Sequence, residues 1–329
     1  MKKVFLAAGI LILTGFSLRS QNIEIPGKPI AEIYTDFHFD PARDTLLAAF
    51  AVEKAYLGYN FIIDKNFSAT LLFNIGKPDE LAVGSKARRY AYYREVSINY
   101  SAEKLNLSLG IINTRLFSYQ QKFWGKRFLA RPFQELNGYG TVADLGFIAD
   151  YKINEMFDLD LSITNGEGYS NIQLDNKLKY AAGITITPSK QMAIRLYCDL
   201  MRQSGLYQTT LVGFTGFKND YFNIGIEVNY KSNLDLTDGH NAWGISGTGG
   251  INLTKKIEFF TRYDYSTSVL LPGDAAKWNY QKDGSFIITG VQYTFNNYVK
   301  IALDYQGTFP VDASKSVSDL IFLNALFKF

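Results

Sequence analysis

A segment about one third of the way along the chain concentrates positive charge and aromatic rings. Against the single acid Glu135, residues 113–140 hold five cations: Arg115, Lys122, Lys126, Arg127 and Arg131. Guanidinium and ammonium groups bind phosphate and carboxylate oxygens, so this set predicts contacts with small anions. Seven aromatic residues share the segment, which indicates that it packs against the rest of the protein instead of extending into water.

Three further cations fall on the polar faces of predicted strands, where they would line the wall of a pore: Arg195, Arg262 and Lys300. Acids on such faces are also frequent, and they include Asp36, Asp144, Asp150, Asp160, Glu227, Asp264 and Asp304. The cations of the segment could therefore pair with these acids, or with the phosphates of lipopolysaccharide, instead of binding a passing anion.

Catalytic and metal chemistry find little support in the sequence. The chain has two histidines, His38 and His240, and no serine lies in a G-x-S-x-G turn. His38 fits a solvated polar face better than a general base, although a hydrolase remains the weakest of three alternatives. The run 165–168 offers one acid, too few oxygen ligands for calcium. We expect no enzyme activity, no cofactor and no metal site, and Cys198 is expected to face lipid as an inert apolar residue.

Alternating apolar and polar residues predict the elements that position these cations. Sixteen stretches of strand length carry this period-2 pattern, and the last one ends on the apolar set Ile321, Leu323, Ala325, Phe327 and Phe329. A soluble sandwich rarely sustains such alternation over sixteen strands. We therefore predict an all-β fold, a transmembrane antiparallel barrel of 16 strands with a polar, water-filled lumen.

Connection lengths support the barrel independently. The gaps after the even-numbered strands are short, whereas nearly all odd gaps are longer, as for periplasmic turns and external loops. Residues 113–140 form the third and longest external loop, which we expect to fold into the lumen. Arg94 is the one charge in a lipid-facing set; it could snorkel at the interface, mark a register shift in its strand, or face a neighbouring subunit.

The N-terminus has the pattern of a secretory signal peptide. Lys2 and Lys3 precede an apolar run from Val4 to Phe16, and residues 17–20 offer a small residue for cleavage before Gln21. We expect a signal peptide over 1–20, a periplasmic lead-in over 21–29 and the barrel over 30–329. Residues 1–20 contain three of the 34 basic residues and none of the 31 acids, so 31 of each remain and no nucleic-acid partner is indicated.

Four stretches resemble the phosphate-selective porin O/P family: Leu109–Phe117, Lys122–Arg127, Ala143–Gly146 and Thr164–Tyr169. The resemblance is clearest over about residues 90 to 170. It implies a sixteen-stranded barrel, commonly trimeric, with an inward third loop and pore-lining arginines and lysines. By this resemblance, Arg115, Lys122, Lys126, Arg127 and Arg131 are the candidates for anion contacts.

Together these observations predict a porin in the outer membrane of a Gram-negative cell. It would passively conduct small hydrophilic solutes, with a preference for anions such as phosphate-like oxyanions. The expected partners are outer-membrane lipid and lipopolysaccharide, small anionic or polar solutes, and two further copies in a homotrimer. The main alternative is a closed scaffold or adhesion barrel whose loops bind surface partners.

Overall fold

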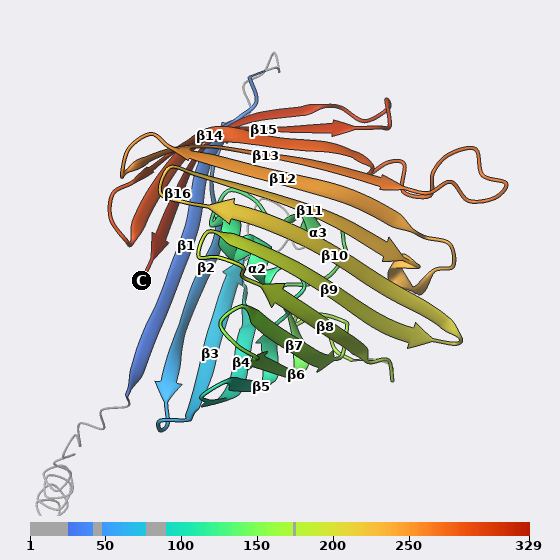
Figure 1. The fold of residues 1–329 in the computed structure, drawn as a ribbon. Coiled ribbons are helices and arrows are strands. Elements are labelled where there is room, and N and C mark those ends of the chain that lie inside the picture. The colour runs from blue at the N-terminus through green and yellow to red at the C-terminus, as the bar shows by residue number, and fades with distance from the viewer. Residues whose placement is uncertain (1–25, 42–47, 77–89, 174–175) are drawn as a thin grey trace, which may run out of the picture.

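The computed structural model describes residues 26–41, 48–76, 90–173 and 176–329. In these residues, sixteen antiparallel strands form a closed barrel in which every strand pairs with its sequence neighbours (Figure 1). The first eight are β1 Gly27–Phe39, β2 Ala48–Ile62, β3 Phe67–Gly76, β4 Tyr90–Ala102, β5 Leu105–Asn113, β6 Ala143–Lys152, β7 Phe157–Thr164 and β8 Lys179–Ile186. The others are β9 Met192–Gln203, β10 Leu206–Lys218, β11 Phe222–Ser232, β12 Ala242–Asn252, β13 Ile257–Ser268, β14 Gly284–Thr294, β15 Val299–Pro310 and β16 Ser318–Lys328.

The barrel closes where the last strand meets the first. β1 and β16 pair from Glu32 opposite Lys328 to Phe39 opposite Ile321, and the Phe329 amide donates to the Ala31 carbonyl at 2.7 Å. Closure leaves no sheet edge with unpaired backbone groups, which is the condition for a β-structure in lipid. The predicted all-β barrel and its strand number are confirmed.

Side chains alternate between an apolar outer face and a largely polar interior. Leu57, Leu109 and Leu303 are each about 60% exposed, whereas Asn74, Asp199 and Asn229 are at most 3% exposed. This is the reverse of a soluble core and is the surface that a lipid bilayer requires. No helix within the described ranges combines the length and the apolar character needed to cross a membrane.

The two ends of the barrel differ in their connections. The turns at 63–66, 103–104 and 153–156 lie at one end, which we call the short-turn end; the connections at the other end, the long-loop end, include 114–142 and 269–283. One connection departs from this rule. β9 and β10 join at the long-loop end through Ser204 and Gly205 alone, and both residues have positive φ, as a tight hairpin requires. On β10, Leu211 faces outward and Phe214 is buried inside the barrel.

Two bulges interrupt the alternation. The β1–β2 pairing skips Glu53, and the β3–β4 pairing runs from Leu72 opposite Glu95 to Phe73 opposite Tyr93, which leaves Arg94 as the extra residue. Arg94 is 7% exposed, and its Nη2 donates to Asn113 Oδ1 at 2.8 Å. Of the three explanations for this charge, the register shift is therefore the one the structure has. The lipid-facing assignment of Arg94 is wrong, because a bulge reverses the side-chain alternation.

The expected N-terminal segments fall mostly outside the described residues. The signal peptide over 1–20 and the first five residues of the lead-in are among these. The remainder of the lead-in is partly strand, because β1 starts at Gly27 and pairs Gly27 with Phe61 and Pro29 with Tyr59. The regular sheet thus begins three residues before position 30.

Candidate functional site: the segment inside the barrel

Residues 114–142, which connect β5 to β6, lie inside the barrel, where Figure 1 shows their two helices surrounded by strands. We call these residues the inner segment. Its helices are α2 Ser118–Trp124 and α3 Phe133–Leu136. α2 ends at Gly125, whose φ of 70° places it in the left-handed region and whose amide donates to the Gln121 carbonyl.

The aromatic residues of the inner segment bury themselves against the barrel wall. Trp124, Phe128 and Leu129 are each less than 10% exposed. Their apolar cluster includes these inward side chains of the wall: Tyr34, Tyr56, Phe260, Ile288, Ala302 and Leu326. Burial of rings this large supplies about 1.5–3 kcal/mol per side chain, so the contact holds the segment to β13–β16 and β1–β2.

Two smaller apolar contacts fix the ends of the segment. Leu116 and Phe117 pack with Tyr197 and Val212, on the inward faces of β9 and β10. Phe133 and Tyr139 pack with Ala242 and are covered in part by Trp278. The segment is thus attached to several sides of the wall, which confirms the expectation that its aromatic residues are packed.

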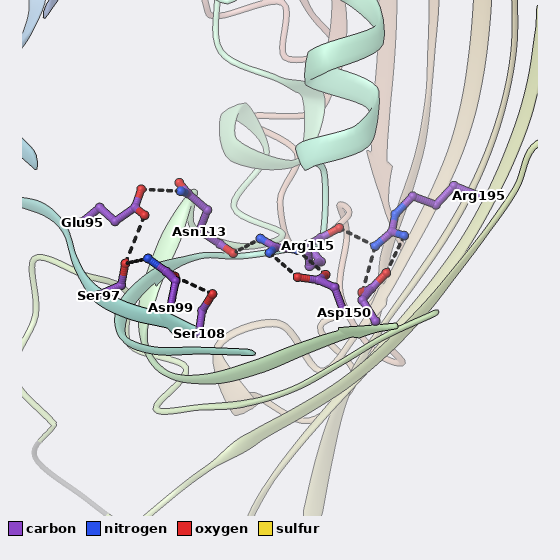
Figure 2. Close-up of polar contacts among 9 residues, drawn as sticks. Glu95, Ser97, Asn99, Ser108, Asn113, Arg115, Asp150 and Arg195 are labelled. Carbon is purple, nitrogen blue, oxygen red and sulfur yellow. Dashed lines mark hydrogen bonds and ion pairs between the residues drawn. The ribbon is translucent and has the colours of Figure 1, made fainter. Parts of the chain in front are cut away.

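At its start, the inner segment joins a chain of ion pairs (Figure 2). Arg115 binds Asp150 through Nε at 2.8 Å and Nη2 at 2.7 Å. Burial lowers the pKa of Arg115, but the bonds to Asp150 outweigh that effect and leave the pKa raised. Arg195 donates to the Arg115 carbonyl at 2.7 Å and to Asp160 at 2.7 Å. Arg115, a predicted anion contact, and Arg195, a predicted wall cation, therefore each hold a carboxylate of the wall.

Lys126 and Arg127 are also paired. Lys126 is 4% exposed and lies 2.6 Å from Glu258 Oε1, although burial still lowers its pKa. Arg127 lies 2.7 Å from Glu135 Oε2 and donates to Gln121 at 2.9 Å. Burial lowers the pKa of Arg127, but Glu135 outweighs that effect and raises it. Glu135, the sole acid of the predicted loop, thus pairs with a cation of the same loop.

Arg262 connects the wall to the middle of the segment. Its Nη1 donates to the Arg131 carbonyl at 2.7 Å, its Nε donates to Asp264 at 2.9 Å, and its guanidinium lies 4.8 Å from the centre of the Trp124 ring. The Arg131 side chain is half exposed and lies 3.9 Å from Glu135. Arg262 therefore positions the segment by charge, hydrogen bonds and a cation–π contact.

Lys122 and Lys300 behave differently from the other predicted residues. Lys122 is exposed on α2, Lys300 is half-buried on β15, and neither has a carboxylate within ion-pair distance among the described residues. Both line a cavity of about 440 Å³ between the inner segment and the short-turn end. We call this space the short-turn cavity. Its other charged lining residues are Glu32, Arg94, Glu95, Arg127 and Lys328.

Sequence reasoning missed several charged residues of the barrel interior. Arg94 was assigned to the outer face because its bulge is invisible in the alternation. Lys328 lies on the inward face of the last strand and pairs with Glu32 at 3.3 Å. It was missed because the prediction used only the apolar face of that strand. Glu258 alternates inward on β13 and could have been found from the period alone.

A ladder of small polar side chains lies on the wall formed by β4 and β5 (Figure 2). Asn113 donates to Glu95 at 2.6 Å, Ser97 donates to Glu95 at 3.3 Å, and Ser108 donates to Asn99 at 2.7 Å. These groups satisfy one another and offer spare donors and acceptors to water. This wall therefore presents a polar surface to the lumen.

Two cavities open on the other side of the inner segment, toward the long-loop end. One, of about 570 Å³, is lined by four acids and a single lysine: Glu135, Asp235, Asp264, Asp283 and Lys282. The second, of about 560 Å³, has a mixed lining that includes Arg131. The inner segment therefore separates spaces that differ in charge.

Comparison with models of known protein families and with curated proteins finds no match. Solved structures do match. OmpF of Salmonella typhi, in complex with daunomycin, superposes with a TM-score of 0.71 at 10% identity over 92% of this chain and 97% of that chain. The outer-membrane channel DcaP of Acinetobacter baumannii gives 0.66 at 11% identity, with 92% and 97% coverage.

OmpT of Vibrio cholerae, in a trimer form, gives a TM-score of 0.61 at 10% identity over 92% of this chain and 99% of that chain. At these identities the likeness concerns the fold. It covers nearly the whole of each chain. The chain has the fold of the outer-membrane porins.

Proposed function

We propose that this protein is an outer-membrane porin that passively conducts small hydrophilic solutes. The observation that carries the proposal is the closed barrel, apolar outside and polar inside, with cavities on both sides of the inner segment. Water and small solutes would pass along the polar wall. The fold shared with OmpF and DcaP supports this reading.

We propose further that the pore prefers anions and that the short-turn cavity sets the preference. Five cations and two acids line it, and the pairs Arg127–Glu135 and Lys328–Glu32 account for two of these cations and one of these acids. Three cations remain against Glu95, which is an excess of two positive charges. Lys122 and Lys300 are the best candidates for contacts with a passing anion, because water reaches them. Rings of such groups at a narrow point attract anions.

The same geometry favours a general anion preference over a dedicated phosphate site. The guanidinium groups of Arg115, Arg195 and Arg262 are already engaged by Asp150, Asp160 and Asp264. A phosphate would have to displace a carboxylate to bind there. Phosphate-like oxyanions are expected to pass with other small anions.

We also propose that the short-turn end faces the periplasm and that three copies assemble in the membrane. Short turns face the periplasm in barrels of this class, and the trimer form of OmpT supports the assembly. Chemical crosslinking in outer-membrane vesicles, followed by mass measurement, tests it; a band of one copy only would contradict the homotrimer.

Planar-bilayer recording tests conduction and preference together. The unaltered protein should give single-channel steps and a reversal potential of the anion-selective sign in a salt gradient. The double variant Lys122→Ala, Lys300→Ala should lower the anion-to-cation permeability ratio. Lys152→Ala is the matched control, because Lys152 pairs with Glu155 in an exposed turn.

Each outcome bears on a different part of the proposal. Absence of current would favour the closed scaffold. Cation preference in the unaltered protein, or an unchanged ratio in the double variant, would remove the assigned role of the short-turn cavity and leave conduction standing.

A further inference from the structure

The outer face of the barrel has a shallow, open apolar groove that conduction does not explain. It lies over β7–β11 and has a volume of about 650 Å³. The groove exists because Ala182, Cys198 and Gly213 place little or no side chain on the outer face. A Cβ added at Gly213 would touch only the tip of Leu196, at 3.9 Å.

The pairing of the strands arranges the side chains of the groove in rows across the sheet. Ala182 lies opposite Cys198 and Cys198 opposite Leu211; in the next row, Leu196 lies opposite Gly213 and Gly213 opposite Val228. Leucines and valine form the walls, while the small residues form the floor. Such a slot fits a hydrocarbon chain.

A cation stands above the groove on the same outward row of β9. Arg202 follows Cys198 by four residues, about 13 Å along the strand. It is exposed at the long-loop end, and its guanidinium lies 5.1 Å from the centre of the Tyr207 ring. Between Arg202 and the groove, Thr209 lies opposite Leu200 and Ser232 lies opposite Thr209, which adds two hydroxyl groups to the outer face.

We propose that this surface binds a phosphorylated, acylated lipid of the outer leaflet, with one acyl chain in the groove and a phosphate on Arg202. Charge complementarity argues for this occupant, because an outward cation at the membrane rim matches an anionic head group. The hydroxyl groups of Thr209 and Ser232 can hydrogen-bond to the sugar or ester oxygens that lie between the acyl chain and the phosphate. The inference rests on the proposed outer-membrane location and on the long-loop end facing outward, but not on conduction.

Native mass spectrometry of the detergent-purified full protein with added bis-phosphorylated lipid A tests the site. Gly213→Leu fills the groove, and Arg202→Gln removes the cation; each should reduce bound lipid several-fold. Gly247→Leu and Lys256→Gln are the matched controls. Gly247 is also an outward glycine, with nothing within 4 Å of an added Cβ, and Lys256 is a cation beside a tyrosine ring at the opposite end.

Cys198 provides a readout at the groove itself, since it is the single cysteine of the chain and is exposed. Bound lipid A should slow its reaction with a maleimide in the unaltered protein. Equal lipid binding by all four variants, equal binding of dephosphorylated lipid A, or unprotected Cys198 would each overturn the proposal. A change in oligomer mass in Gly213→Leu with unchanged lipid binding would assign the face to another copy instead.

Channel recording separates this inference from the proposed function. Gly213→Leu and Arg202→Gln face away from the lumen, so their single-channel conductance should equal that of the unaltered protein. Loss of lipid binding with normal current therefore supports the site, and absence of current in every variant concerns conduction alone.

Discussion

The paired cations and the solvated cations of the barrel interior have similar side chains but different surroundings. Arg115, Lys126 and Arg127 each meet a carboxylate at 2.6–2.7 Å. Lys122 and Lys300 face a water-accessible cavity. A paired cation builds the wall and contributes little field to the lumen, whereas a solvated one acts on passing ions. Counting basic residues in a pore loop therefore overstates its pull on anions.

The largest effect should follow from breaking a buried ion pair of the wall. Asp160→Asn leaves Arg195, whose side chain is 3% exposed, without its carboxylate. Such a loss costs about 3–5 kcal/mol. The free energy of unfolding in urea, followed by tryptophan fluorescence, measures it. Asp158→Asn, an exposed position on the same face of β7, should change stability by less than about 0.5 kcal/mol; equal effects would contradict the assignment.

The second-largest effect should follow from weakening the apolar contact between the inner segment and the wall. Leu129→Ala removes a buried side chain between the segment and the wall, at a cost of about 2–4 kcal/mol. Because the segment narrows the lumen, we expect larger or noisier single-channel conductance as well. Leu136→Ala is the control, since Leu136 is 44% exposed. Unchanged conductance in Leu129→Ala would mean that this contact does not set the width of the pore.

Low pH should weaken the ion pair between Arg127 and Glu135 inside the inner segment. Burial raises the pKa of Glu135, but Arg127, Lys54 and Arg131 outweigh it, and the pKa is lowered. The stability that Glu135 contributes is therefore complete above its unfolded pKa of about 4.3 and is lost as the pH falls through the lower folded value. Glu135→Gln should be less stable than the unaltered protein at pH 7, and the difference should shrink below about pH 4. Urea unfolding at both pH values would reveal a constant difference if the pairing were unimportant.

The smallest effect on stability should accompany a clear effect on ions. Lys122→Ala removes an exposed side chain, so the free energy of unfolding should stay within about 0.5 kcal/mol. The reversal potential in a salt gradient should nevertheless move toward cations. Lys126→Met should show the opposite combination, with reduced stability and a nearly unchanged reversal potential. If both variants shifted the potential equally, the distinction between paired and solvated cations would fail.

Much of the fold could be predicted because alternation is local. Each strand shows its two faces in its own sequence, so all sixteen were found, and Cys198 was correctly placed on the outer face. The bulge at Arg94 could not be predicted, since it depends on how β4 pairs with Leu72 and Phe73 of β3. The ion pairs could not be predicted either. Lys126 and Glu258 are 132 residues apart, and only the closed barrel brings them together.

The two bulges also indicate where the chain can lose one residue without changing which side chains face lipid. At Glu53 and at Arg94 the outward residues switch from one parity to the other. Deleting either residue would leave a regular strand with both halves still facing the correct solvent, while the same deletion in β5 would turn half a strand inside out. Natural relatives that are shorter by one residue in β2 or β4 should carry their gap at these two positions.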